Sequence, residues 1–243
     1  LGGIPEDLAS LIEYYDKKYP PAIISYSGRY LPKWGNYSID VRVFASCGVN
    51  DNVLYEHVKR ARAFVRDIIN EKGCSFHEAC DEAVLRVARS TPVFYQYDYN
   101  NYNVDEYWMF APETYKVVYE IKRGADCDDY ANMRHVLCRI AGVPAGLLRV
   151  VCGDTKGKLG GHASNYYLKS DGNWYHINST STITSFSDWK DKDDPNDAIG
   201  IGDVWFSYND LNSWSVFKTD TAEHSFYNNK SKLTRHITIL RYW

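Results

Sequence analysis

One cysteine of this chain stands where a helix is expected to begin. Cys127 precedes a segment from Tyr130 to Ala141 in which apolar residues recur at intervals of three and four, which predicts a helix with one buried stripe. Gly142 and Pro144 predict where that helix ends. A thiol in the first turn lies near backbone N–H groups and the positive end of the helix dipole, which favour a thiolate. The alternative interpretation is a small buried apolar residue, the usual role of a free cysteine.

A thiolate nucleophile also needs an imidazole base and a third group that orients the imidazole ring. His162 follows two glycines at the start of a predicted strand and is the best base candidate. Asn178 lies sixteen positions later, on the predicted return strand, and could orient the ring. The alternatives are a structural or exposed histidine and an N-glycosylation sequon at 178–180.

The register of this predicted hairpin decides whether the two side chains share a face of the sheet. The Ser-Asp-Gly-Asn segment 170–173 indicates the turn. A two-residue turn at 171–172 would pair His162 with Ser181 and would place Asn178 on the opposite face. An odd-length loop centred near Ser170 would set His162 directly opposite Asn178. We predict the second register, or a bulge that restores it.

The elements that must position these residues form a helical part followed by strands. We expect residues 1–50 to form an extension that packs on the core, and residues 51–243 to form the core with a β-rich C-terminal extension. The predicted helices are Val53–Ile69, Ser75–Arg89 with a capping box at Ser75 and Glu78, a helix opening at Ala111, and the helix headed by Cys127. The predicted strands are Ile39–Phe44, Ala145–Cys152, His162–Lys169, Trp174–Asn178, and stretches at 204–206, 214–217 and 236–242.

Composition limits the classes of function. A net charge of −3 provides no basic surface for nucleic acid, and no apolar run is long enough to span a bilayer. The six cysteines show no zinc-binding spacing, so we expect neither a metal nor another cofactor. Aromatic residues make up 15% of the chain. The tyrosine-rich stretch 95–102 could line a groove beside Cys127 or form a surface loop, and the glycine-rich loop 153–161 could form another wall.

Several segments together resemble the transglutaminase-like superfamily. They are Trp108, Ala111–Thr114, Gly124–Ala131, Ala141–Ala145, Gly161–Ala163, Trp174 and Ile177–Thr180. The segments 105–108 and 112–114 resemble more closely its branch of bacterial transglutaminase-like cysteine proteinases. The resemblance implies a papain-like α+β fold in which a helical part carries the cysteine and packs on an antiparallel β-sheet that carries the histidine and asparagine. It implies Cys127 as nucleophile, His162 as general base and Asn178 as orienting residue. This chain departs from the family pattern at Ala125, usually glycine, and at Asn178, usually aspartate.

These residues predict a thiol acyl-transfer enzyme, a peptidase or amidase that cleaves an amide in a protein or peptide through a Cys127 thioester. Protein-glutamine transglutamination would use the same residues, and an inactive binding or assembly module is a further alternative. The backbone N–H of Cys127 is the expected first oxyanion donor, with Gln96 or the indole of Trp108 as second donor. We expect the helix end and a protonated His162 to outweigh the nearby carboxylates, taken as solvated, and to favour the thiolate.

Overall fold

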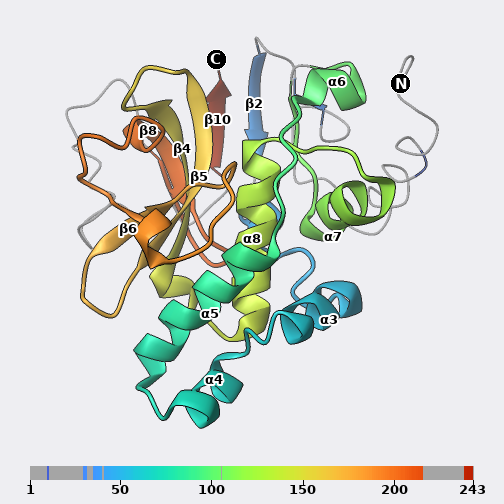
Figure 1. Ribbon diagram of the computed structural model, residues 1–243. Helices are drawn as coiled ribbons and strands as arrows, with labels where there is room; N and C mark the ends of the chain where they lie inside the picture. The colour runs from blue at the N-terminus through green and yellow to red at the C-terminus, as the bar shows by residue number, and fades with distance from the viewer. Residues whose placement is uncertain are drawn as a thin grey trace.

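The computed structural model describes Ser10 and residues 30–31, 35–39, 41–104, 106–215 and 238–242. Within these ranges helices come first and an antiparallel sheet follows, the α+β transglutaminase-like arrangement predicted from the sequence (Figure 1). The helices are α2 (Arg42–Ser46), α3 (Asn52–Arg60), α4 (Val65–Lys72), α5 (Phe76–Ser90), α6 (Asp98–Tyr102), α7 (Ala111–Tyr115), the π-helix η1 (Lys116–Ile121), α8 (Cys127–Ala141) and the short 3₁₀ turns η2 (Ala145–Leu147) and η3 (Phe186–Asp188).

The main sheet has six strands in the order β7-β6-β5-β4-β8-β9. Its strands are β4 (Leu148–Thr155), β5 (Gly161–Leu168), β6 (Trp174–Ile177), β7 (Lys190–Asp191), β8 (Ile201–Tyr208) and β9 (Ser213–Ser215). Two small pairs join distant parts of the chain: β1 (Tyr30–Leu31) with β3 (Glu106–Tyr107), and β2 (Gly35–Ile39) with β10 (Thr238–Tyr242). Of the predicted strands, the residues Asp40, Val216, Phe217, His236 and Ile237 lie outside the described residues, as does most of the predicted N-terminal extension.

Helix α8 is the central element of the fold. It stands between the sheet and the helices α3 and α7 (Figure 1). It begins at Cys127 and ends before Gly142, whose φ of 98° is the left-handed conformation that favours glycine at a helix end. Both boundaries confirm the prediction. Almost every side chain of α8 is buried, because the sheet covers one side and other helices cover the rest.

The helices before α8 confirm one prediction and correct another. Helix α5 begins after Ser75, and the capping box between Ser75 and Glu78 is formed as predicted. The single helix predicted over Val53–Ile69 is wrong, because α3 ends at Arg60 and α4 begins at Val65. A Schellman-type end separates them: Arg62 has a φ of 54°, and the backbone N–H of Ala63 donates to the carbonyl of Val58. Since the left-handed residue is arginine, no glycine in the sequence marks the break.

Two further boundaries differ from the predictions. The strand predicted over Ile39–Phe44 ends at Ile39, and α2 begins at Arg42. A helix there buries Phe44 and Ala45 in a core cluster with Trp108, so packing overrides the short alternating pattern. The strand predicted to begin at Ala145 begins at Leu148, after η2, and continues to Thr155.

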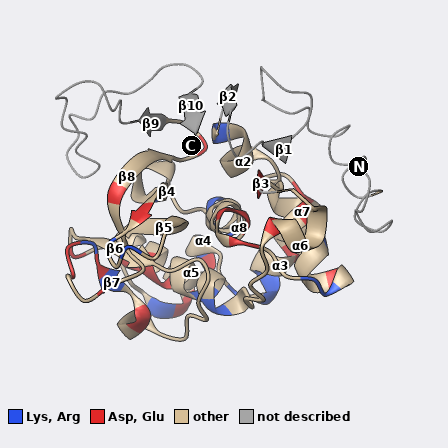
Figure 2. Cartoon of the chain, turned by 90° about the horizontal axis from the view of Figure 1, so that it is seen from above, with Lys and Arg blue, Asp and Glu red and all other residues tan. Residues whose placement is uncertain are grey.

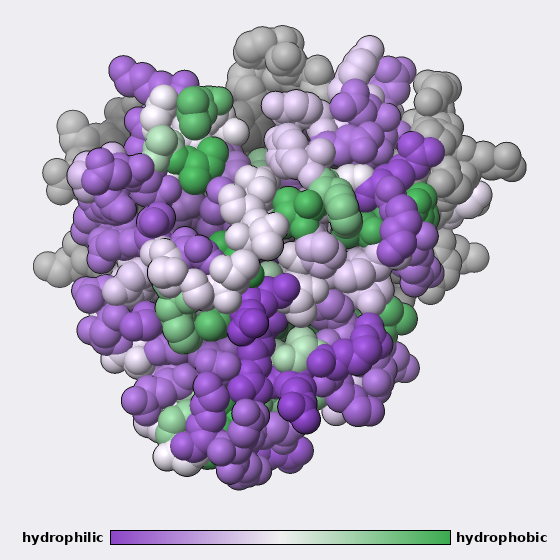
Figure 3. Space-filling view, viewed as in Figure 1, coloured by the Kyte–Doolittle hydropathy of each residue, from purple (hydrophilic) through white to green (hydrophobic). Residues whose placement is uncertain are grey.

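Apolar side chains form two main clusters. The larger one fills the space between α5, α8 and the sheet. The other packs between α2, the first turns of α8 and the sheet, and includes Trp108, Phe206 and Tyr208. The described helices include none long and apolar enough to cross a bilayer. The face seen in Figure 3 is largely hydrophilic, with hydrophobic residues in small separate patches.

Candidate active site

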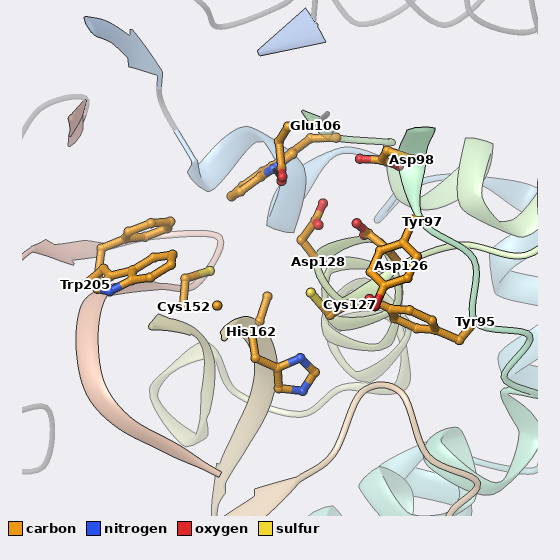
Figure 4. A pocket seen from close by; sticks show the side chains of 14 residues that line it. Tyr95, Tyr97, Asp98, Glu106, Asp126, Cys127, Asp128, Cys152, His162 and Trp205 are labelled. Atoms are coloured by element: carbon orange, nitrogen blue, oxygen red, sulfur yellow. Dashed lines mark hydrogen bonds between the residues drawn. The ribbon is translucent and has the colours of Figure 1, made fainter. Parts of the chain in front are cut away.

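A cavity of about 330 Å³ opens at the N-terminal end of α8. Figure 4 shows Cys127 between His162 on one side and a group of carboxylates on the other. Cys127 and His162 therefore share one cavity, although one lies on helix α8 and the other on strand β5. The lining residues are Tyr95, Tyr97, Asp98, Glu106, Trp108, Asp126, Cys127, Asp128, Cys152, Gly161, His162, Ala163, Trp205 and Phe206.

Cys127 is the first residue of α8, with Asp126 as N-cap. Its backbone N–H, like the others of the first turn, has no acceptor within the helix. Its thiol accepts a hydrogen bond from the backbone N–H of Ala163, the neighbour of His162 in β5. Within the described residues no hydrogen bond joins this thiol to an imidazole nitrogen of His162. Burial raises the pKa of the Cys127 thiol well above its usual value, the charge of Asp126 raises it further, and the Ala163 N–H opposes both effects only in part.

His162 is paired with Asn178. Its Nε2 lies 3.3 Å from Asn178 Oδ1. That oxygen also accepts from the backbone N–H and the hydroxyl of Thr180, and Asn178 Nδ2 donates to Ser181 Oγ at 2.6 Å. The amide is thus oriented with its oxygen toward His162, so Nε2 carries the proton and Nδ1 is left as the basic nitrogen. Burial lowers the pKa of His162 to about 4, with a further contribution from the nearby His176.

The hairpin register that was predicted is wrong in detail. The loop from Lys169 to Asn173 has an odd length as expected, but the observed pairs Leu168–Trp174 and Asn165–Ile177 centre it on Asp171 rather than Ser170. If this register is continued one residue past β6, Asn178 lies opposite Ser164, which is two residues after His162 on β5. The two side chains share a face, since residues two apart on a strand point the same way.

The turn after Asn178 is held by a buried polar network. Ser179 donates its hydroxyl to the carbonyl of Ala163, and its backbone N–H donates to Ser164 Oγ. Ser164 Oγ lies 2.7 Å from His176 Nε2, and His176 Nδ1 lies 2.6 Å from Asp197 Oδ2. Ser179, the middle residue of the 178–180 sequon, is fully buried, and Asn178 and Thr180 are half-buried. The network fixes the backbone on which Asn178 is carried.

Four carboxyl groups form what we call the acidic cluster: Asp98, Asp126, Asp128 and Asp129. The sequence prediction took the acids beside Cys127 as solvated, and this is wrong, because Asp126, Asp128 and Asp129 are all buried. Asp98 comes from the tyrosine-rich stretch and completes the cluster. Burial, together with mutual repulsion for most of them, raises the pKa of all four carboxyl groups. In Figure 2, which looks down α8, red acidic residues lie at the helix and on the neighbouring segments.

This cluster has the donors of a cation site. Asp126 Oδ1 and Asp128 Oδ2 are buried and have no hydrogen-bond partner. Donor atoms of Asp126, Cys127 and Asp128 lie within 4.8 Å of one another, and so do those of Asp98, Asp126 and Asp129. Carboxylate oxygens are the ligands of hard cations such as Ca²⁺ and Mg²⁺. The acidic residues of the motif were visible in the sequence, but only the fold shows that Asp98 joins them.

The two predicted second oxyanion donors are placed differently. Trp108 lies in the cavity wall, where its indole N–H donates to Glu106 Oε1 at 2.6 Å. Gln96 does not line the cavity, and its side-chain amide donates to Asn101 Oδ1 at 3.0 Å. The fold therefore brings Trp108, but not the Gln96 side chain, beside Cys127.

Aromatic residues form the outer walls of the cavity. Tyr95 and Tyr97, from the tyrosine-rich stretch, lie on one side, and Trp205 lies on the other (Figure 4). Of the two alternatives left open for this stretch, the groove wall holds for Tyr95 and Tyr97, which line the cavity while their side chains stay exposed. Of the glycine-rich loop only Gly161 contributes, because β4 and β5 take up much of the predicted loop. Sequence reasoning gave no site role to Glu106, although it lies in the family-like segment 105–108, and none to Trp205, which was assigned only to a strand.

This chain is similar to one family model and to solved structures of low sequence identity. Residues 78–179 match the family model described as the transglutaminase-like superfamily. Among solved structures, Legionella pneumophila LapG after EGTA treatment is 16% identical, with a TM-score of 0.40 over 69% of this chain and 87% of that one. Calcium-bound Legionella pneumophila LapG is 15% identical, with a TM-score of 0.39 over 63% and 88%. No curated protein matches the chain. By this match, residues 78–179 form a domain that is similar to the transglutaminase-like superfamily.

Proposed function

We propose that this protein is a thiol acyl-transfer enzyme, a cysteine peptidase or amidase that acts on a protein or peptide with Cys127, His162 and Asn178. The observation that carries the proposal is the His162–Asn178 hydrogen bond in the wall of the cavity into which α8 directs Cys127. The similarity of residues 78–179 to the superfamily supports the same reaction class.

In the proposed reaction Asn178 Oδ1 accepts a hydrogen bond from the Nε2–H of His162, which leaves Nδ1 free to take the thiol proton. The Cys127 side chain must first turn from the Ala163 N–H toward that nitrogen. The sulfur then attacks the amide carbonyl, and the backbone N–H of Cys127 stabilises the oxyanion. When the C–N bond breaks, His162 gives its proton to the leaving amine. Water, activated by the same imidazole, hydrolyses the thioester and frees the thiol.

The charges of the described site favour a neutral resting pair. The pKa of Cys127 is raised and that of His162 is lowered to about 4, so thiol and imidazole are both uncharged at neutral pH. The sequence-based expectation of a preformed thiolate–imidazolium pair depended on solvated acids, whereas the acids are buried. His162 therefore acts as a general base that takes the thiol proton during the attack, and not as a preformed imidazolium.

A divalent cation fits the same site. Asp126 and Asp128 would hold it, with Asp98 and Asp129 behind them, because their oxygens include the two buried atoms that lack a partner. Such a cation would neutralise the carboxylates beside the thiol and so make ionisation of Cys127 easier. This proposal replaces the sequence-based expectation that no metal takes part.

The test uses p-nitrophenyl acetate, which reports acyl transfer without knowledge of the natural substrate. We expect acetylation of Cys127, located by peptide mass spectrometry in samples quenched before the thioester is hydrolysed, to exceed that of the half-buried Cys47 and Cys74. His162→Ala is expected to remove the preferential acetylation of Cys127. Cys127→Ala gives the background acetylation of the other cysteines. Equal acetylation of the three cysteines, with calcium chloride or with EDTA, would contradict the proposal and favour an inactive binding module.

Transfer to an amine instead of water is the alternative within the same chemistry. A fluorescent primary amine, incubated with the enzyme and a glutamine-containing protein, distinguishes the two. Incorporation of the label into that protein, absent in Cys127→Ala, would identify a transglutaminase. Cleavage of the protein without incorporation supports the peptidase.

A further inference from the structure

Arg134 connects the helix that carries Cys127 to the turn that carries Asn178. It lies about two turns after Cys127 in α8 and is almost fully buried. Its Nη1 donates to the backbone carbonyl of Asn178 at 2.7 Å, and its Nη2 donates to the carbonyl of Ser181 at 3.0 Å. One guanidinium thus holds both ends of the four-residue turn 178–181.

The same turn orients the amide of Asn178. Every polar contact of that amide other than the one to His162 goes to Thr180 or Ser181 within the turn. If the carbonyls at positions 178 and 181 move, these partners move with them. The direction of Asn178 Oδ1, and through it the position of the proton on His162, therefore depends on the backbone that Arg134 holds.

Packing alone does not account for an arginine at this position. Within the described residues Arg134 makes no ion pair, and its Nε has no hydrogen-bond partner. Burial without an acidic partner disfavours the charged form and lowers the pKa of Arg134 to about 10. An apolar side chain would fill the space without burying a charge. What the arginine supplies in addition is the pair of hydrogen bonds in a fixed fork.

We propose that Arg134 is a positioning residue, which keeps Asn178 Oδ1 on His162 Nε2 and so keeps His162 Nδ1 free to act as the base. The catalytic use of this arrangement rests on the proposed function above. The positional effect itself does not, because it concerns the His162–Asn178 pair in the resting protein.

The experiment is a double-mutant cycle with two readouts. Arg134→Gln and Arg134→Lys are combined with Asn178→Ala, and each protein is assayed for Cys127 acetylation by p-nitrophenyl acetate in calcium buffer. The second readout is the tautomer of His162, taken from long-range ¹H–¹⁵N NMR spectra of the imidazole. Arg139→Lys is the matched control, because Arg139 lies on the same helix but binds Asp210 and the Val143 carbonyl. Circular dichroism and thermal unfolding establish that each variant is folded.

We expect Arg134→Gln to lower the acetylation rate about tenfold or more and to remove the preference for the Nε2–H tautomer, as Asn178→Ala does. Arg134→Lys, which keeps the charge and one donor direction, should fall between Arg134→Gln and the wild type. In the Asn178→Ala background Arg134→Gln should have no further effect, since both changes act through one group. A merely structural role would give additive losses.

Two outcomes would overturn the inference: a folded Arg134→Gln protein with the wild-type tautomer, or additive losses in the cycle. Failure of the proposed function is distinguishable from either. In that case Cys127 of the wild type is not acetylated preferentially, while the tautomer of His162 still reports whether Arg134 positions Asn178. Where Arg134→Gln does not fold, Arg134→Lys provides both readouts.

Discussion

Replacement of Asn178 by alanine removes four hydrogen bonds at once. The lost contacts are those to His162 Nε2 at 3.3 Å, to the N–H and hydroxyl of Thr180 at 3.0 Å each, and to Ser181 Oγ at 2.6 Å. Each such bond contributes about 1 kcal/mol net, and the turn is only partly buried, so water replaces some of them. We expect the free energy of unfolding to fall by about 2 to 3 kcal/mol.

The loss of acyl transfer should be larger than the loss of stability. Without an acceptor at Nε2 the imidazole ring is free to hold its proton on Nδ1, where it cannot receive the proton of Cys127. In a serine protease triad the wrong tautomer costs about 10⁴ in rate. Here the correct tautomer remains accessible, so we expect a loss of about 10² to 10³, which corresponds to about 3 to 4 kcal/mol of barrier.

Asn178→Asp is the companion variant that separates the two effects. A carboxylate keeps the acceptor toward His162 and Thr180, and the Ser181 hydroxyl can reverse to donate. Its charge at 3.3 Å is worth about 5 kcal/mol at an effective dielectric constant near 20, before the cost of desolvation, so the pKa of His162 should rise above about 4. Acetylation of Cys127 and urea unfolding measure both variants. A folded Asn178→Ala protein that acetylates as fast as the wild type would refute the reasoning.

Three further predictions follow from the described residues. Millimolar calcium chloride at pH 7 should raise the melting temperature, and EDTA should reverse the rise, because a cation relieves repulsion in the acidic cluster. Calcium at one hundred times its dissociation constant would raise the free energy of unfolding by about 2.7 kcal/mol. A melting temperature that is the same in both buffers would contradict the cation site. Burial lowers the pKa of His57 to about 4, from 6.5 in the unfolded chain, so this group costs stability as the pH falls from about 6.5 toward 4. His57→Gln should therefore flatten the pH dependence of the free energy of unfolding, measured with urea, by up to about 3 kcal/mol at pH 4. Identical pH profiles for the wild type and the variant would contradict this role of His57. Gly124→Ala should destabilise by about 2 kcal/mol or more, since its Cβ would lie 2.4 Å from the Phe94 carbonyl, whereas Gly146→Ala, with open space around it, should be neutral or slightly stabilising in the same urea titration.

The local features of the site could be predicted from the sequence. The start of α8 at Cys127, its end at Gly142, the capping box of α5 and the hairpin after His162 are each determined by residues within a few positions of one another. Caps, glycine at helix ends and apolar periodicity are short-range effects, so one sequence carries them. The order of helices and strands followed from the same signals, whereas the fold class was implied by the resemblance to the superfamily.

Register and helix breaks were less predictable for a physical reason. The sequence indicated a turn near Asp171 but not the length of its loop, and a change of one residue moves every pairing of the strand. The break after Arg60 uses a left-handed arginine, which sequence statistics do not mark. Such choices are decided by small differences in packing and backbone energy summed over many neighbours.

Only the tertiary structure decided the electrostatics of the site. On the isolated helix Asp128 and Asp129 belong to a solvated first turn, yet the segment around Met109 covers them, and its N–H donates to Asp129. The same folding brings Asp98 to the cluster and sets Arg134 against the turn of Asn178. The sequence by itself determined which groups could do the chemistry. Their burial, and with it their charge, depends on chain segments far away in sequence, because desolvation is a property of the whole packed surroundings and not of the residue.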